Sequence, residues 1–301
     1  MHINNSSLPY VSVIIPSLNS KLINKTLDSI FSQTFSEYIL EIIVIGLDEL
    51  NLIIKREPVR FISTHTPVTA PVARNIGIRE ARGKCLAFID ADCIADSRWL
   101  EMLLSAQQQG KPVVGGSVSL EVDNYWQLCY NLTMFHQFLT IAPPGERENL
   151  GTLNLCVDRE VVERVGLFDE SLARGQDTEW TLRMRRYGYK LHFVPEAIVK
   201  HLPEVTNLAQ ILKLWYKSGF FNAQVRYKYR DIIALHPFYN RPSLLLLSSP
   251  IIGAIVTVHI FARNPRLLRY AHTIPVIFLT KVAWCLGARH WTRLLTENGY
   301  V

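Results

Sequence analysis

The chain has 301 residues, of which 49% are hydrophobic and 19% are charged, and its formal net charge at pH 7 is +6. This composition excludes a disordered chain, and the length allows one large α/β domain with an appendage, or two modest domains. The positive charge suits an anionic membrane surface or a phosphorylated substrate. No basic run interleaved with aromatic residues occurs before residue 200, which argues against a nucleic-acid partner. Five scattered cysteines without a C-x-x-C pair argue against a disulfide framework and a structural zinc site.

The first part of the chain alternates short apolar runs with helical patterns. Residues 11–15 precede Pro16, which predicts a buried strand ended by proline. Asn19 can cap a helix in which apolar residues recur at helical spacing over 22–31. Further strands are predicted at 41–45, 59–63, 85–89 and from 113, and further helices at 72–82 and 97–109. The alternation predicts a mainly parallel sheet covered by helices, with ligands beyond the carboxyl ends of the strands.

The last part of the chain is more apolar. A basic, aromatic helix is predicted at 208–230, and residues 243–261 contain no charged side chain over about the length that crosses a bilayer. A second apolar stretch, 274–287, is interrupted by Lys281. Arginines flank 243–261 on both sides, which strains the positive-inside rule for a full span. A span, an interfacial arrangement, and a buried helix at the catalytic domain or a dimer interface remain as alternatives.

The catalytic part is expected in the cytoplasm, because residues 1–10 are polar and do not resemble a signal peptide. The predicted organisation has three parts: a catalytic domain at 1–205, an amphipathic connecting helix at 206–240, and hydrophobic, membrane-associated helices at 241–301.

Two carboxylates, Asp90 and Asp92, follow the predicted strand 85–89. At this spacing both can turn toward one Mg²⁺ or Mn²⁺ ion together with its phosphate ligands. Such an ion would neutralise a nucleotide diphosphate as it leaves. The alternative is a loop of surface and helix-capping aspartates.

A second acidic pair, Asp177 and Glu179, could supply a general base, or it could be the acidic first turn of a helix. His201 ends a strand-like segment and is either a further metal ligand or a structural histidine. Arg74 lies near a helix start, where it could pair with phosphate or form a surface salt bridge.

Six short motifs occur in the chain in the following order: VSVIIP at 11–16, ARNIGI at 73–78, FIDAD at 88–92, GTLNL at 151–155, VGLFDE at 165–170 and GQDTEW at 175–180. In this order they resemble the family 2 glycosyltransferases with the GT-A fold, over about residues 9–205. The resemblance implies a Rossmann-like, mainly parallel sheet flanked by helices, and an inverting transfer of the hexosyltransferase type.

The resemblance also implies roles for individual residues. Asp177 would be the base, while Asp92, Asp90 and His201 would hold Mn²⁺ or Mg²⁺. The nucleotide-sugar donor would be bound by Pro16, Ser17, Asn19, Asp48, Arg74 and Asp90. The donor or acceptor sugar would lie near Asn154, Gln176, Glu179 and Trp180. The expected acceptor is lipid-linked or a cell-surface polysaccharide, which places the enzyme in envelope polysaccharide biosynthesis at a membrane.

The chain departs from the family pattern in three places. The loop after the second strand has Gly46 and Leu47 where an acidic pair is usual, so Asp48 is the candidate for gripping the base or ribose. Gln176 replaces the usual glutamate before the catalytic aspartate. The arginine-tryptophan signature of processive synthases is absent from QILKLW at 210–215, which favours transfer of one sugar per encounter.

Two other functions remain open at this point. A nucleotidyltransferase also uses paired aspartates and metal on an α/β sheet, but it leaves the GQDTEW motif and the apolar tail unexplained. A membrane-anchored binding module that kept the fold without turnover would be consistent with Gly46, Leu47 and Gln176.

Overall fold

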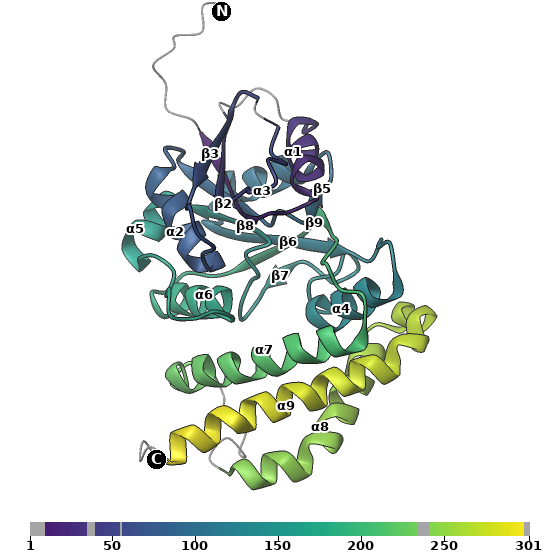
Figure 1. Cartoon of the computed structure of the whole chain (residues 1–301). Coiled ribbons are helices and arrows are strands. Elements are labelled where there is room, and N and C mark those ends of the chain that lie inside the picture. The colour runs from purple at the N-terminus through teal and green to yellow at the C-terminus, as the bar shows by residue number, and fades with distance from the viewer. Residues whose placement is uncertain (1–9, 35–39, 55, 234–240, 298–301) are drawn as a thin grey trace, which may run out of the picture. The chain divides into compact units, whose positions relative to one another are not determined.

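The computed structural model describes residues 10–34, 40–54, 56–233 and 241–297 (Figure 1). Most of the segment on which the expectation of no signal peptide rests, residues 1–9, lies outside this range. The chain forms two compact units. The sheet unit comprises residues 1–119 and 138–202, and the helical unit comprises residues 120–137 and 203–301. The helical unit therefore includes a segment inserted between two parts of the sheet unit.

One mixed sheet forms the centre of the sheet unit. Among the described residues its strands are β1 (Val11–Leu18), β2 (Leu40–Leu47), β3 (Val59–Ser63), β4 (Cys85–Ile89), β5 (Cys93–Ala95), β6 (Val113–Ser119), β7 (Gly145–Glu146), β8 (Asn154–Asp158) and β9 (His192–His201). The strand order is β3-β2-β1-β4-β8-β6-β9-β5, and β7 pairs with β9. Strands β3, β2, β1 and β4 are parallel, as are β6 and β9, while β8 runs antiparallel between β4 and β6. The predicted mainly parallel sheet flanked by helices is confirmed.

Helices cover the sheet and complete its core. They are α1 (Ile23–Phe31), α2 (Ala70–Glu80), α3 (Trp99–Gln108), α5 (Arg159–Val165) and α6 (Gln176–Arg186). Apolar residues of α2, α5 and α6 share one buried cluster with β1, β2, β4 and β8. Helix α3 packs on β6, β8 and β9. This core fixes the strand ends that carry the candidate site.

The first strand does not end at Pro16, as the sequence suggested, but continues to Leu18. The reason is the pairing pattern, because β4 pairs only with residues Val11 to Ile14 of β1. Pro16 therefore lies where β1 has β2 as a neighbour on one side only. Proline is tolerated in a strand at such a place, since no second ladder needs its missing amide hydrogen.

The helical unit consists of α4 (Tyr125–Phe135), α7 (Leu208–Lys228), α8 (Pro242–Arg263), the 3₁₀ segment η2 (Pro265–Thr273) and α9 (Ile274–Glu297). Helix α9 lies between α7 and α8 (Figure 1). The backbones of α7 and α9 approach closely, because a Cβ on Gly219 would lie 2.0 Å from the Trp284 carbonyl oxygen. Likewise, a Cβ on Gly287 would lie 1.9 Å from the Tyr216 carbonyl oxygen.

The two predicted apolar stretches belong to long helices. Residues 243–261 fall inside α8, and residues 274–287 begin α9, which continues past Lys281 to Glu297. By length and composition alone, α8 and the η2–α9 segment could each cross a membrane.

Candidate active site

The loop between β4 and β5 faces the end of β9. Asp90 and Asp92 directly follow β4, and His201 is the last residue of β9. Strands β5 and β9 run antiparallel, with Cys93 paired to His201. Asp92 Oδ2 lies 3.6 Å from His201 Nε2. The structure therefore brings together an aspartate and a histidine that lie far apart in the sequence.

The donor atoms of this cluster fit a divalent cation. Potential ligand atoms of Asp92, Cys93 and His201 lie within 4.8 Å of one another. Mn²⁺ and Mg²⁺ prefer oxygen ligands to soft thiolates, so the buried Cys93 thiol is the least suited of the three groups. Burial alone would raise the pKa of Asp92, but the charge and hydrogen bonding of His201, together with Arg74, bring it below its ordinary value. A carboxylate and an imidazole remain, a donor set that suits Mn²⁺ and can be completed by phosphate oxygens.

Hydroxyl groups near the start of α1 hold the loop between β4 and β5, which contains Asp90 and Asp92 and is called the acidic loop below. Ser20 Oγ and Thr26 Oγ1 donate to the carbonyl oxygen of Ala91 at 2.9 and 3.0 Å. On the other side of the loop, the Leu202 amide donates to the Asp92 carbonyl at 2.9 Å. These contacts fix the backbone between the two aspartates. Sequence reasoning missed Ser20 and Thr26, and their only signal was two hydroxyl residues at the start of a predicted helix.

Arg74 is buried and oriented toward the acidic loop. Its Nη2 lies 2.7 Å from Asp90 Oδ1, and the side chain is only 3% exposed. Its Nε and Nη1 are buried and have no hydrogen-bond partner within the described part of the chain. A buried guanidinium with two unpaired donors is costly unless an acceptor completes it. Arg74 is therefore suited to bind an anionic oxygen near Asp90.

Asp177 lies in the first turn of α6, after Gly175, which has a φ of 73°. The backbone of Gly151 runs beside it, since a Cβ at Gly151 would lie 3.8 Å from Asp177 Oδ2. Burial raises the pKa of Asp177, and the Asp90 charge adds to this effect, while the Thr178 amide, Arg74 and Arg174 oppose it. The charges of Asp90 and Arg74 thus act on Asp177, so it belongs to the same electrostatic neighbourhood. A carboxylate with a raised pKa is suited to accept a proton.

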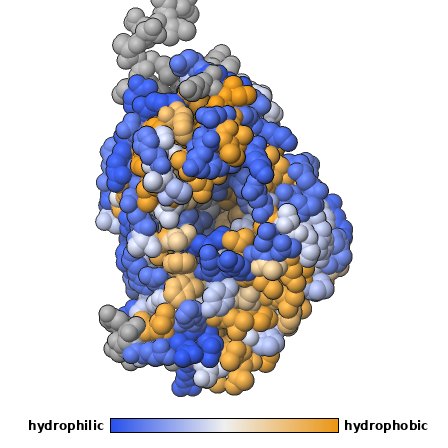
Figure 2. Space-filling view, in the orientation of Figure 1, coloured by the Kyte–Doolittle hydropathy of each residue, from blue (hydrophilic) through white to orange (hydrophobic). Residues whose placement is uncertain are grey.

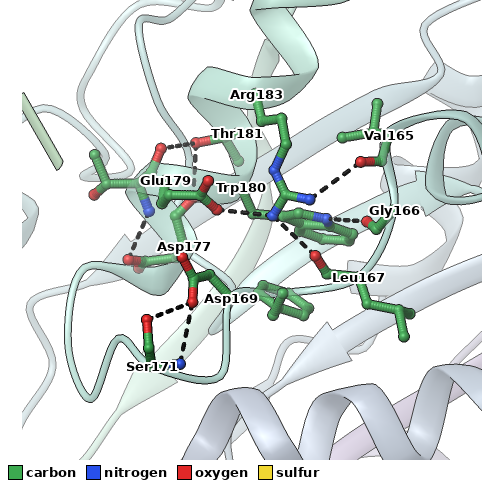
Figure 3. A network of polar contacts seen from close by, with 12 residues as sticks. Val165, Gly166, Leu167, Asp169, Ser171, Asp177, Glu179, Trp180, Thr181 and Arg183 are labelled. Carbon is green, nitrogen blue, oxygen red and sulfur yellow. Dashed lines mark hydrogen bonds and ion pairs between the residues drawn. The ribbon is translucent and has the colours of Figure 1, made fainter. Parts of the chain in front are cut away.

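The second acid of this pair, Glu179, points elsewhere and is buried. Its Oε2 lies 2.8 Å from Arg183 Nη2. Arg183 also donates to the carbonyl oxygens of Val165 and Leu167 (Figure 3). Glu179 therefore neutralises the arginine that anchors the loop after α5, and it does not join Asp177.

Trp180 belongs to the core in the same region. Its Nε1 donates to the Gly166 carbonyl at 2.8 Å (Figure 3). The centre of its ring lies 4.0 Å from the centre of the Phe168 ring, and the ring packs edge-on against Phe88. Asn75, which sequence reasoning did not single out, holds the same loop, because its side chain exchanges hydrogen bonds with the Phe168 backbone at 2.9 and 3.0 Å.

The two amide side chains expected near the sugar have different surroundings. Asn154 is buried, accepts a hydrogen bond from Trp99, and donates to the carbonyls of Ser117 and Ala197 at 3.0 and 2.8 Å. It therefore joins α3 to β6 and β9. Gln176 has a buried Oε1 with no partner among the described residues, beside Asp177.

The residues expected at the nucleotide lie where β1 and β2 end. Pro16 and Ser17 are in β1, and Asn19, with a φ of 49°, follows it. The Asn19 side chain exchanges hydrogen bonds with Glu49, accepting from its amide at 2.8 Å. The Asp48 carboxylate accepts from two backbone amides of its own loop.

A close approach explains the glycine in this loop. A Cβ on Gly46 would lie 1.9 Å from the Ser17 carbonyl oxygen, and Gly46 has a φ of +141°. A side chain at this position is therefore excluded, and this accounts for one of the two departures from the acidic pair.

The fold is shared with a solved glycosyltransferase. The mannosyltransferase PcManGT from Pyrobaculum calidifontis, in complex with GDP-Man and Mn²⁺, superposes with a TM-score of 0.57 at 16% identity, over 91% of this chain and 86% of that chain. The architecture, with an acidic loop after β4, thus defines a GT-A fold.

Sequence comparison identifies the family. The profile of Glycosyl transferase family 2 matches residues 12–140. Glycosyltransferase AglE of Haloferax volcanii is 30% identical over 76% of this chain and 80% of its own length. A dolichyl N-acetyl-α-D-glucosaminyl phosphate 3-β-D-2,3-diacetamido-2,3-dideoxy-β-D-glucuronosyltransferase of Methanococcus voltae is 23% identical over 84% of this chain and 85% of its own length. The chain belongs to glycosyltransferase family 2.

Proposed function

We propose that the protein transfers one sugar from a nucleotide-diphosphate-sugar donor to an acceptor hydroxyl, with inversion at the anomeric carbon. The observation that carries this proposal is the convergence of the Asp92–His201 pair and the Arg74–Asp90 pair on one loop, within the electrostatic reach of Asp177. The donor class is supported by the GDP-Man bound to the Pyrobaculum relative in fold.

Asp92 and His201, assisted by Asp90, would hold a Mn²⁺ or Mg²⁺ ion. The ion supplies positive charge that neutralises the departing nucleotide diphosphate. Arg74 directs its two unpaired donors, Nε and Nη1, at an anionic oxygen of the donor. The Mn²⁺ bound to the Pyrobaculum structure supports a divalent cation.

Asp177 acts as the general base. Its carboxylate takes the proton of the acceptor hydroxyl as the hydroxyl oxygen bonds to the anomeric carbon. The bond from that carbon to the diphosphate oxygen breaks on the opposite face, and the electron pair leaves with the nucleotide diphosphate. A single displacement of this kind inverts the anomeric configuration.

The remaining candidate residues bind the donor or form the walls of the sugar pocket. Pro16, Ser17, Asn19 and Asp48 form the nucleotide side of the site. Gln176 directs its free carbonyl oxygen toward a sugar hydroxyl beside Asp177. Asn154, Glu179 and Trp180 support the sugar pocket from behind, because their polar groups are bound within the protein.

The acceptor is proposed to be lipid-linked or part of a cell-surface polysaccharide, and the catalytic domain, residues 1–205, to face the cytoplasm. The name of the Methanococcus voltae relative includes a dolichyl phosphate acceptor. Helix α7 of the connecting segment 206–240, whose last part lies outside the described residues, and the helices of 241–297 would hold the enzyme at the membrane where such acceptors reside.

The test combines a donor screen with variants. Thermal unfolding of the purified protein is measured with UDP-, GDP-, dTDP- and CMP-sugars, with and without Mn²⁺. We expect one donor to stabilise the protein in a Mn²⁺-dependent way and Asp92→Ala to lose that effect. Asp177→Asn should keep donor binding but lose about a hundredfold to ten-thousandfold in transfer, while the exposed Glu163→Gln keeps both.

Product analysis decides the chemistry. Inverted anomeric configuration in the NMR spectrum of the product is expected. Donor binding without transfer to any hydroxyl acceptor would favour a binding module. Release of inorganic pyrophosphate when a nucleoside triphosphate and a sugar 1-phosphate are offered instead would favour a nucleotidyltransferase.

A further inference from the structure

We infer that α8 lies in the plane of an anionic bilayer surface, with one apolar face among the lipids, and does not cross the bilayer. The inference deepens the membrane association proposed above and rests on it. It concerns the helical unit alone, where apolar surface gathers (Figure 2).

The outer face of α8 is a continuous apolar stripe. Leu247, Ile251, Ile255 and Val258 are 73%, 63%, 63% and 66% exposed. Their spacings of four, four and three residues place them on one side of the helix. Isolated exposed apolar residues are ordinary on protein surfaces, but a stripe of this length marks an interaction face.

The inner face of α8 packs against the rest of the helical unit. Leu245, Ser249, Gly253, Thr257 and Ile260 are buried. A Cβ at Gly253 would lie 3.2 Å from Val282 and 3.3 Å from Phe278, so this face packs directly on α9. One side of α8 therefore packs against protein and the opposite side is exposed, although both sides are apolar.

Helix α9 cannot be separated from α7, which argues against a transmembrane hairpin. The close approaches at Gly219 and Gly287 join the backbones of the two helices. Helix α7 carries the exposed lysines Lys213 and Lys217 in the region that packs on α9. If α8 and α9 crossed a bilayer, α7 would be drawn into hydrocarbon with these charges, which is costly.

A buried lysine shows that one side of α9 is covered by protein within the helical unit. Lys281, in the middle of α9, is buried, with its Nζ 3.1 Å from the Thr133 carbonyl oxygen of α4 and 4.1 Å from the centre of the Trp215 ring of α7. One side of α9 is therefore covered by α4 and α7. Among the described helices of this unit, α8 exposes its apolar residues most strongly, at Leu247, Ile251, Ile255 and Val258.

The charge of the segment identifies the surface that α8 contacts. Between Arg241 and Glu297 the sequence contains no aspartate or glutamate. Exposed arginines stand at both ends of α8 and in η2, namely Arg241, Arg263, Arg266 and Arg269. Basic residues at both ends suit a helix whose two ends lie at the same anionic surface, whereas a spanning helix would place one set on the opposite side.

The first test measures binding to vesicles in the absence of donor and acceptor. The full chain should float with phosphatidylcholine vesicles that contain 30% phosphatidylglycerol and bind at least tenfold more weakly to pure phosphatidylcholine. Ile251→Ser with Ile255→Ser should weaken binding to the anionic vesicles at least tenfold. The matched control is Leu50→Ser with Ile54→Ser, because these exposed apolar residues lie in the sheet unit, and it should bind as the wild type does.

The second test separates an in-plane helix from a spanning one. Single cysteines at 247, 251, 255 and 258 are labelled with a fluorophore, which is feasible because the five native cysteines are buried. Quenching by lipids with a spin label at carbon 5 or carbon 12 then gives the depth of each site. The in-plane arrangement predicts the same shallow depth at all four sites. A depth that changes progressively over about 16 Å from 247 to 258 would indicate a span and overturn the inference.

Two further results would also overturn it. Labels that no lipid quenches, in a protein that dimerises with concentration, would mean that a second copy covers the stripe. Transfer to a soluble acceptor without any vesicle binding would remove this inference alone. Conversely, vesicle binding that persists while Asp177→Asn and wild type both lack transfer would remove only the proposed activity.

Discussion

At the scale of single residues, the raised pKa of Asp177 has a consequence for the pH dependence of the reaction. An aspartate in water titrates near about 3.9. Burial and the neighbouring Asp90 move the pKa of Asp177 above that value, so the carboxylate becomes protonated at a higher pH than usual. A protonated base cannot accept the hydroxyl proton, and kcat should fall about tenfold per pH unit below the raised pKa.

The measurement is kcat between pH 4 and 9 at saturating donor and Mn²⁺. Glu163→Gln should give the same profile, and circular dichroism over the same range shows whether the fold persists. An acid limb of kcat that lies no higher than the pKa of an ordinary aspartate, in folded protein, would contradict a base with the raised pKa of Asp177.

The residue pattern predicted part of this site and not the rest. The aspartates at 90 and 92, with His201 and Arg74, came from motif and spacing, and the structure places them in one neighbourhood. The sequence pattern predicts one acidic pair, Asp177 and Glu179, near the reaction. Residues two apart in a helix, however, point about 200° from one another. That geometry turns Glu179 into the core, where Arg183 neutralises it.

At the scale of elements, the contact between β1 and β2 depends on a glycine. Gly46→Ala should lower the free energy of unfolding by about 1–2 kcal/mol for the left-handed backbone and by about a further 1–3 kcal/mol for the clash with the Ser17 carbonyl. Gly110→Ala is a matched control, since Gly110 also has a positive φ, +81°, but no atom lies within 4 Å of its Cβ position.

Urea unfolding of both variants checks this. The difference between them isolates the steric contact from the backbone strain. Equal losses would show that β1 moves away freely, and that Ser17 does not constrain the loop.

The buried lysine of α9, Lys281, predicts a substitution that stabilises the protein. Burial lowers the pKa of Lys281 to about 7, whereas a lysine in the unfolded chain titrates near about 10.4. Folding therefore disfavours its proton, and the stability of the wild type falls as pH drops from about 10 to 7. Lys281→Met removes this penalty, so the variant should be more stable by about 1–3 kcal/mol at pH 7.

The advantage of Lys281→Met should shrink as pH rises toward 10. Denaturant unfolding of both proteins at several pH values measures it, with the exposed Lys213→Met as control. A variant less stable than the wild type at pH 7 would mean that the contacts of Lys281 with Trp215 and Thr133 outweigh its burial.

The elements up to β6 were predicted better than the contacts between them. Except for the three-residue strand β5, which was missed, they follow from apolar periodicity, which is local. The contacts that hold the acidic loop, from Ser20 and Thr26 to Ala91, join residues 71 and 65 positions apart. Local patterns contain no information about such pairs. The continuation of β1 through Pro16 likewise depends on where β4 stops pairing.

At the scale of the whole molecule, the helical unit is not a simple tail. It includes α4, whose residues Cys129 and Tyr130 share a core cluster with Ile211 and Trp215 of α7. A chain that ends at residue 205 should therefore leave this face of α4 uncovered and aggregate or bind a hydrophobic dye. Size-exclusion chromatography of the truncated and full chains checks this, and a monodisperse truncated protein with unchanged thermal unfolding would contradict it.

The division of the chain into interleaved units also has a consequence for its synthesis. Thr133 of α4 forms a hydrogen bond with Thr280 of α9, its partner 147 residues later. At translation rates of about 5–20 residues per second, α4 waits about 7–30 s for that partner after it leaves the ribosome. During this interval the nascent chain displays an apolar face of α4 whose partners in α7 and α9 are not yet complete. We expect the ribosome-bound chain to recruit a holdase chaperone or the membrane surface itself before its sequence is complete.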